Sequence, residues 1–313
     1  METSYAHVPV MCEEILTLLT PALSTPDAVM LDATLGLGGH SAAALSRFPQ
    51  LTVIGIDRDP QALDMARSNL GELSSRVETH QATYDQITEI LDGRRVDAIL
   101  FDLGLSSLQI DSPERGFAYA FDAPLNMRMD GDNTELTAAD VVNTYSAREL
   151  ERIFRLSDEK YARRIAQAIV DERDRSPFTT SARLVSVISA AVPAKDPRTG
   201  HPAKRVFQAL RMEVNSERDC LIRALPQGLD ALKVGGLMAV LSYHSGEDRL
   251  VKRVFTEAQS DQVPPGIPIV PESYRARFAM VTRGAHKPSD AEAELNPRAK
   301  PARLRVITRT EED

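Results

Sequence analysis

Short apolar runs rich in β-branched residues alternate with helical patterns along the first hundred residues. The runs expected as strands are 28–34, 51–57, 76–80 and 96–104, and a fifth follows at 237–244. This alternation constrains the chain to a parallel, doubly wound α/β sheet with helices on both faces. Two runs near the end, 277–282 and 303–309, are expected to add an antiparallel edge.

The connection between the fourth and fifth strands is far longer than a parallel crossover needs. Helical periodicity dominates the stretch between Asp102 and Leu237. We therefore expect an inserted α-helical domain at 109–206, within an α/β domain formed by 1–108 and 207–313.

The net charge of −8 hides a basic middle segment. Residues 1–145 carry a net charge of −14, residues 146–218 carry +5 and residues 219–313 carry +1. An acidic chain does not coat nucleic acid over its whole surface, but a basic segment permits local phosphate contact. The alternative is an ordinary solvated helix surface, and the charge pattern leaves both open.

Membrane, secreted and metal-binding classes find no support in the sequence. No run approaches the roughly 20 apolar residues that cross a bilayer, and the first residues lack the basic and apolar parts of a signal peptide. Cys12 and Cys220 lie far apart, and neither has a metal-ligand spacing. We expect a cytoplasmic protein with no disulfide, no metal site and no membrane partner.

A glycine-rich turn follows the first strand, with glycines at 36, 38 and 39. Glycines at the start of a helix let a ligand approach bare backbone amides. The spacing differs from G-x-G-x-x-G, which makes a dinucleotide the weaker inference. Turn chemistry without a ligand is the alternative.

Acidic residues end the second and fourth strands. Asp57 lies about 20 residues beyond the glycines, where a carboxylate accepts both hydroxyls of a ribose, and Asp59 is expected to cap the next helix. Asp102 ends the fourth strand, and ligands of open α/β sheets bind outside such strand ends. An adenosine ligand without a pyrophosphate fits, and S-adenosylmethionine is the commonest candidate. For Asp57 the alternative is an ordinary strand-end carboxylate.

Several further motifs occur in one order along the chain. They are 32–41 (DATLGLGGHS), 102–111 (DLGLSSLQID), 115–117 (RGF), 124–130 (PLNMRMD), 162–166 (ARRIA), 201–211 (HPAKRVFQALR), Asn215, 243–249 (YHSGEDR) and 296–298 (NPR). Together they resemble the MraW-type family, ribosomal RNA small subunit methyltransferase H, over about 7–305. Agreement of so many motifs by chance is very improbable.

In that family a Rossmann-like class I methyltransferase sheet, interrupted by a helical domain, methylates N4 of a cytidine in the decoding region of bacterial 16S rRNA. The resemblance implies the same fold and activity here, with S-adenosyl-L-methionine as cofactor. It implies 16S rRNA within the small ribosomal subunit as partner. The oligomeric state stays open, with a homodimer among the options.

The resemblance also assigns individual residues to the cofactor. The implied contacts are Gly38, Gly39, His40, Asp57, Tyr84, Asp102 and Gln109, with Tyr84 beside the adenine. Three positions depart from the family pattern: Asn126 replaces the usual Asp, Gly246 a Leu, and Tyr243 the common Phe. The first departure puts a carboxylate role in doubt, and we interpret the other two as packing changes.

Methylation of a cytosine amine requires positioning, because the nitrogen lone pair is delocalised into the ring. Asp102 is a candidate to hold the amine hydrogens, although a pure cofactor contact is the favoured alternative. His244, at the end of the fifth strand, is a candidate to orient the base or relay its proton. A strand-end histidine bonded to the backbone is at least an equal alternative.

The base must leave its stack to enter such a site, so the inserted domain is expected to hold the RNA. The candidate phosphate contacts are Arg163, Arg164, Lys204, Arg205 and Arg211. For each of them a surface ion pair is the alternative. Phe117 and Phe207 are candidate stacking residues, with burial in the core the favoured alternative.

Other functions remain open on the residues alone. A dehydrogenase would need a second pyrophosphate turn and a hydride partner, and neither is found. A methyltransferase for another substrate would keep the same cofactor residues. A non-catalytic factor that binds ribosomal subunits would need the basic insertion, but not Asp57 or the glycine turn.

Overall fold

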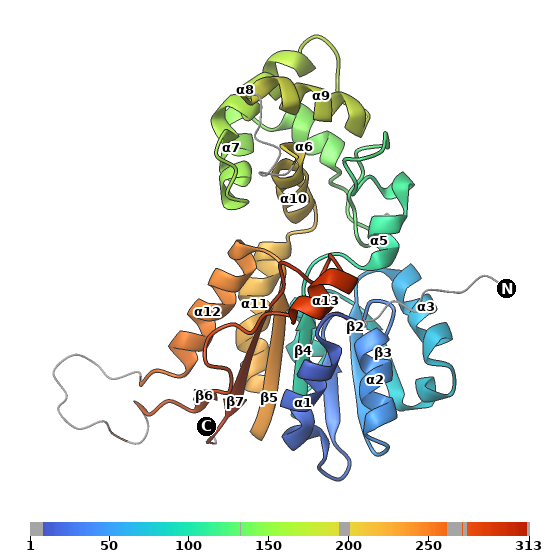
Figure 1. Cartoon of the computed structure of the whole chain (residues 1–313), viewed down its shortest axis with the longest axis vertical. Coiled ribbons are helices and arrows are strands. Elements are labelled where there is room, and N and C mark those ends of the chain that lie inside the picture. The colour runs from blue at the N-terminus through green and yellow to red at the C-terminus, as the bar shows by residue number, and fades with distance from the viewer. Residues whose placement is uncertain (1–8, 132, 194–200, 262–270, 272–273, 312–313) are drawn as a thin grey trace. The chain divides into compact units, whose positions relative to one another are not determined.

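The computed structural model describes residues 9–131, 133–193, 201–261, 271 and 274–311 (Figure 1). The chain divides into two compact units. The first comprises Met1–Gly104 and Cys220–Asp313, and the second comprises Leu105–Asp219. Among the described residues, no helix combines the length and apolar character needed to span a membrane.

A seven-stranded sheet forms the centre of the first unit, in the order β3-β2-β1-β4-β5-β7-β6. The strands are β1 Val29–Asp32, β2 Thr52–Asp57, β3 Val77–Gln81, β4 Val96–Asp102, β5 Leu232–Ser242, β6 Phe278–Met280 and β7 Arg303–Arg309. The first five strands are parallel to one another, whereas β7 pairs antiparallel with both β5 and β6. The expected α/β fold with an antiparallel edge is confirmed.

Helices cover both faces of this sheet. The helices of the first unit are α1 Cys12–Leu23, α2 Gly39–Arg47, α3 Pro60–Leu70, α4 Ile87–Leu91, α12 Ser245–Ala258 and α13 Asp290–Leu295, and α11 Glu217–Ala231 lies mostly within it. Apolar residues of α1 and α2 form one buried cluster with strand residues such as Met30 and Leu100. Alternate strand residues, Leu31 and Phe101 among them, form another with α4, α11 and α12. This alternation is that of strands buried on both faces.

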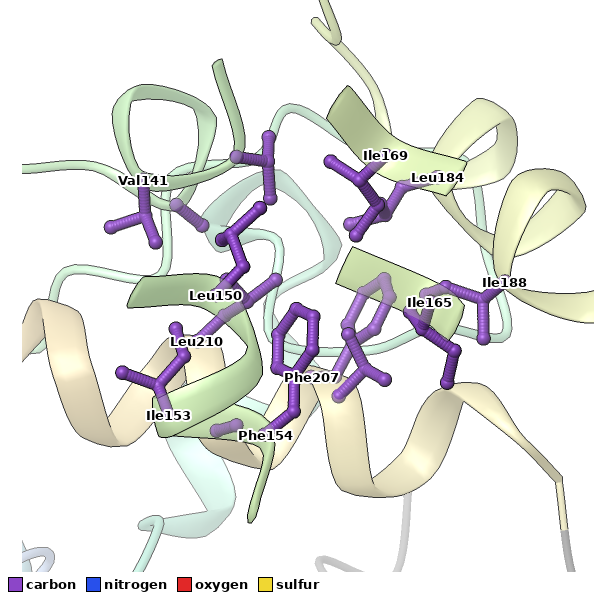
Figure 2. Close-up of a cluster of buried hydrophobic side chains, with 14 of the residues drawn as sticks. Val141, Leu150, Ile153, Phe154, Ile165, Ile169, Leu184, Ile188, Phe207 and Leu210 are labelled. Atoms are coloured by element: carbon purple, nitrogen blue, oxygen red, sulfur yellow. The ribbon is translucent and has the colours of Figure 1, made fainter. Parts of the chain in front are cut away.

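The second unit is helical. Its helices are α5 Ser107–Asp111, α6 Ala138–Thr144, α7 Ala147–Leu156, α8 Ala162–Arg173, α9 Ser181–Ala191 and α10 Ala203–Val214. Their apolar faces enclose one core, in which Phe154, Ile165 and Leu184 are fully buried (Figure 2). Side chains spaced three and four residues apart point the same way on a helix, which is why each helix contributes one stripe.

The inserted segment is longer than the expected 109–206. The predicted boundary at 206/207 falls inside α10, whose residues Phe207 and Leu210 belong to the core of the helical unit. The sequence predicts a continuous helical pattern from 203 to about 232, but the helix breaks between α10 and α11. There Ser216 adopts a left-handed backbone with φ of 51°, which ends the first helix.

Candidate active site

The glycine turn joins the end of β1 to the start of α2. Gly36 and Gly38 have φ of 53° and 80°, a backbone region that favours glycine. Gly39 is required for a different reason, because an added Cβ would lie 2.7 Å from Cγ of Pro9. Gly38, the N-cap residue of α2, has no side chain to cap the helix, which leaves amides of its first turn available to a ligand.

Asp57 lies beside this turn at the end of β2. One carboxylate oxygen accepts the backbone N–H of Gly36 at 2.8 Å, and the other accepts that of Asp59 at 2.9 Å. Desolvation raises the pKa of Asp57 to about 6, despite these two hydrogen bonds. Asp59 caps α3 through its contact with Gln61, as expected.

Asp32 is a third strand-end carboxylate, which the sequence interpretation did not single out. It is buried at the end of β1 and accepts the hydroxyl of Ser41 at 2.6 Å and the N–H of Thr34 at 3.2 Å. Burial raises its pKa above the ordinary value. Asp32 therefore connects the two ends of the glycine turn. Its position at the start of the DATLGLGGHS motif could have indicated this role from the sequence.

Asp102 ends β4 and faces two side chains of the same unit. Its Oδ1 accepts the hydroxyl of Tyr243 at 2.7 Å, and its Oδ2 lies 3.5 Å from Nδ1 of His40. The other ring nitrogen of His40, Nε2, lies 3.0 Å from the carbonyl oxygen of Val10. The backbone N–H of Asp102 donates to the Thr34 hydroxyl at 2.6 Å. Tyr243, interpreted from sequence as a packing change, thus has a polar contact at the predicted site.

The two remaining predicted cofactor residues lie in different units. Tyr84 begins a short 3-10 helix after β3, and its ring meets that of Phe101 edge to face, with 5.9 Å between the centroids. Gln109 belongs to the second unit, where it is buried and forms a reciprocal capping box with Ser106 at the start of α5. Its contact with a cofactor stays a prediction.

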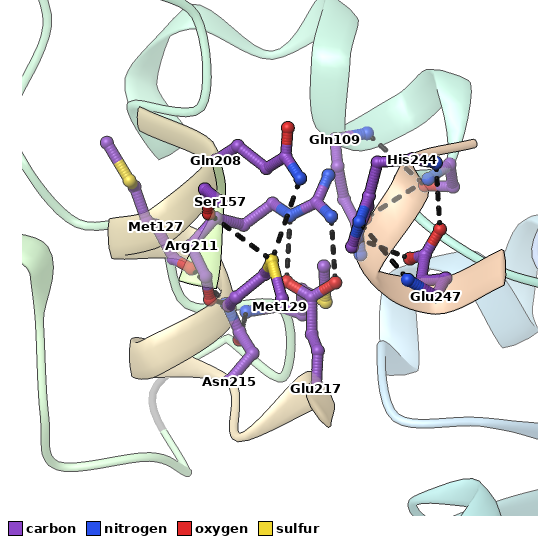
Figure 3. Close-up of polar contacts among 12 residues, drawn as sticks. Gln109, Met127, Met129, Ser157, Gln208, Arg211, Asn215, Glu217, His244 and Glu247 are labelled. Carbon is purple, nitrogen blue, oxygen red and sulfur yellow. Dashed lines mark hydrogen bonds and ion pairs between the residues drawn. The ribbon is translucent and has the colours of Figure 1, made fainter. Parts of the chain in front are cut away.

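His244 is the N-cap of α12. Its Nδ1 accepts the backbone N–H groups of Gly246 and Glu247, at 3.2 and 3.4 Å. Glu247 returns the contact by accepting the N–H groups of Tyr243 and His244, a capping box visible in part in Figure 3. Because Nδ1 acts as an acceptor, the neutral ring carries its hydrogen on Nε2. This geometry matches the alternative of a histidine bonded to the backbone.

The predicted phosphate contacts fall into two groups. Arg163 and Arg164 are exposed on α8, and Lys204 and Arg205 on α10; none of the four forms an ion pair with a residue that the structure describes. Arg163 and Arg164 line a shallow hollow with Lys160, Gln167 and Tyr161. Tyr161, which is 39% exposed, lies among these residues, and the sequence interpretation did not single it out.

Arg211 differs from that group. Its Nε and Nη2 donate to the two carboxylate oxygens of Glu217 at 2.7 and 2.8 Å, and both side chains are shielded from solvent (Figure 3). A shielded two-point pair holds the guanidinium away from a phosphate, so we remove Arg211 from the RNA-contact set. Phe117 and Phe207 are buried in the helical core, which confirms the core interpretation of both rings.

Asn126 makes a local contact with Arg128. Its Oδ1 accepts the Nε–H of Arg128 at 2.8 Å and the backbone N–H of the same residue at 3.2 Å. An amide oxygen accepts such hydrogen bonds as a carboxylate oxygen does, but without the added strength of the negative charge.

The sheet order and the acids at the ends of β1, β2 and β4 define a Rossmann-like class I methyltransferase fold. Relatives named ribosomal RNA small subunit methyltransferase H match nearly the whole chain. The protein of Saccharopolyspora erythraea is 54% identical over 311 residues, covering 98% of this chain and 94% of its own. That of Streptomyces avermitilis is 51% identical over 312 residues, covering 98% of each chain. The MraW methylase family matches residues 4–310, and the chain belongs to that family.

Proposed function

We propose that the protein transfers a methyl group from S-adenosylmethionine to N4 of a cytidine in the decoding region of 16S rRNA. One observation carries the proposal. Strand β1 lies between β2 and β4, so the glycine turn, Asp57 and Asp102 converge at the carboxyl ends of three adjacent strands. That edge is where open α/β sheets bind nucleotide-like ligands.

The donor set fits an adenosyl ligand. We propose that Asp57 accepts the ribose hydroxyls, that Tyr84 contacts the adenine, and that Gly38 and Gly39 let the ligand approach the start of α2. We assign His40 and Asp102 to the same ligand, and the contact of Gln109 stays a prediction from the resemblance. When bound, S-adenosylmethionine supplies an electrophilic methyl group on a sulfonium.

The chain's own contribution to the reaction is positioning. The Asp102 carboxylate can accept hydrogens of the cytosine amine or of the cofactor, and we favour the cofactor. His244 stays a candidate to orient the base, although its Nε2 is buried and lies 3.0 Å from Oε1 of Glu247. If His244 acted as a base, Nδ1 would have to take up the proton. That atom already accepts hydrogen bonds from the backbone N–H groups at the start of α12.

The pKa of Asp57 makes cofactor affinity dependent on pH. Ribose hydroxyls donate to the ionised carboxylate, and a proton competes with them below about pH 6. We expect the affinity for S-adenosylhomocysteine to fall as pH drops, approaching about tenfold per pH unit well below the pKa. Calorimetric titrations between about pH 5 and pH 7.5 test this, and a constant affinity over that range contradicts it.

The basic helices α8 and α10 are proposed to bind the RNA. Charge reversal of Lys204 and Arg205 together should weaken binding of small subunits that lack the modification, and reduce the salt dependence. The negative slope of log affinity against log salt should become shallower by about 0.7 for each phosphate of single-stranded RNA that the variant no longer neutralises.

The matched control reverses Arg155 and Arg175, which are exposed in the same unit but paired with Glu151 and Glu172. The control should affect RNA binding less than the Lys204 and Arg205 variant does. Equal effects of the two variants on RNA binding would show a general charge effect. A reduction confined to cofactor affinity would mean that the helical unit is misassigned.

The substrate itself is identified by mapping. Small subunits lacking the modification are incubated with labelled S-adenosylmethionine, and the labelled nucleotide is located. Label on N4 of a decoding-region cytidine supports the proposal, whereas label elsewhere indicates another substrate and no label indicates a non-catalytic binding factor. The proposal places the protein in the cytoplasm with the small subunit as partner, and a homodimer would appear in its mass in solution.

A further inference from the structure

Tyr243 follows strand β5 and contacts Asp102 at the end of the neighbouring parallel strand β4. Leu241 of β5 lies opposite Asp102 of β4. Side chains alternate along a strand, so Tyr243, two residues further on, continues on the Leu241 side. Leu241 and Tyr243 accordingly belong to, or pack against, the same apolar cluster. From there the Tyr243 hydroxyl donates to Oδ1 of Asp102 at 2.7 Å.

Tyr243 is held through its backbone and through its side chain. Its backbone N–H donates to Glu247 at 2.9 Å, which ties the residue to the start of α12. Packing on the apolar cluster completes the support. The hydroxyl therefore points at Asp102 from a fixed position rather than from a mobile side chain.

The hydroxyl acts on Asp102 as a hydrogen-bond donor. Burial and the nearby Asp102 carboxylate raise the pKa of Tyr243 far above its usual range, which keeps it a phenol and excludes it as a base. A phenol donor occupies one lone pair of Oδ1 and restricts rotation of the carboxylate, while His40 faces Oδ2. Phenylalanine would preserve the packing but supply no donor.

We propose that Tyr243 is a positioning residue that fixes the Asp102 carboxylate for its contact with S-adenosylmethionine. This inference rests on the proposed function, because it requires a cofactor at the ends of the parallel strands. It replaces the interpretation of Tyr243 as a packing change. The tyrosine acts through Asp102 and needs no contact of its own with the substrate.

The variant Tyr243→Phe tests the role of the hydroxyl. We expect the affinity for S-adenosylhomocysteine to fall about tenfold, the effect of one charge-assisted hydrogen bond. The KM for S-adenosylmethionine should rise with little change in kcat on small subunits. Tyr274→Phe, at an exposed tyrosine of the same unit, is the matched control and should change neither value.

A double-mutant cycle with Asp102→Asn shows whether the two residues act together. If Tyr243 works through Asp102, adding Tyr243→Phe to Asp102→Asn causes little further reduction in affinity. An unchanged affinity in the single variant, an equal reduction in both backgrounds, or a fall in kcat alone would each overturn the inference. Failure of the wild-type protein to bind S-adenosylhomocysteine would instead overturn the proposed function, and this inference with it.

Discussion

Replacing Asp57 by alanine should reduce the affinity for S-adenosylhomocysteine at least about 100-fold and abolish methyl transfer. The variant would lack two hydrogen bonds from ribose hydroxyls to an ionised carboxylate, and each such bond contributes about 1.5–3 kcal/mol. Calorimetry measures the affinity, and transfer of labelled methyl to small subunits measures the activity. Unchanged binding and activity in this variant would refute the proposed site.

The neighbouring carboxylate supplies a control with the opposite outcome. Asp59 caps α3 by accepting the N–H of Gln61, so Asp59→Ala should lower the free energy of unfolding by about 1 kcal/mol. Its affinity for S-adenosylhomocysteine should stay close to that of the wild type. An equal fall in affinity in the Asp57 and Asp59 variants would show that the effect comes from a disturbed loop and not from a missing ribose contact.

Replacing Gly116 by alanine should destabilise the protein more than replacing Gly131, the other glycine that the structure describes in the helical unit. The residue has φ of 73°, and an added Cβ would lie 2.0 Å from the carbonyl oxygen of Pro124. The neighbouring backbone is paired there, with the N–H of Met127 donating to Arg115 at 2.9 Å, so the clash cannot be relieved by one side chain. We expect the free energy of unfolding to fall by more than about 4 kcal/mol, measured by urea unfolding.

Gly131 separates the two causes of that destabilisation. It has a similar φ of 69°, but among the described residues no atom beyond its chain neighbours lies within 4 Å of an added Cβ. Gly131→Ala should therefore cost only the left-handed backbone strain of roughly 1–2 kcal/mol. If the two alanine variants are equally destabilised, the clash with Pro124 contributes nothing and the prediction for Gly116 is wrong.

Much of the fold was predictable because apolar runs and helical periodicity are local properties. The start of β5 was not. In the sequence, Gly235 and Gly236 indicate the end of a helix, with the strand after them. In the structure β5 already begins at Leu232, and its register with β4 shifts between Val96 and Ala98. A β-bulge depends on the partner strand, which a local pattern does not contain.

The candidate site was predictable where topology alone decides. Acids at the ends of β2 and β4 must lie near one another once the sheet is parallel. The contact of Tyr243 with Asp102 was not predictable, because it depends on register between strands far apart in sequence. The pairing of Arg211 with Glu217 was missed because it crosses the unexpected break between α10 and α11.

The position of the inserted segment has an evolutionary consequence. Strands β4 and β5 are neighbours in the sheet, and α11 already provides the kind of crossover helix that joins two parallel strands. Leu105–Asp219 is thus inserted into the connection between β4 and β5, and most of the crossover helix α11 lies outside this segment. Asp57 and Asp102, which are proposed to contact the methyl donor, lie outside this segment, so mutations in it can alter the proposed RNA contacts and leave both carboxylates in place.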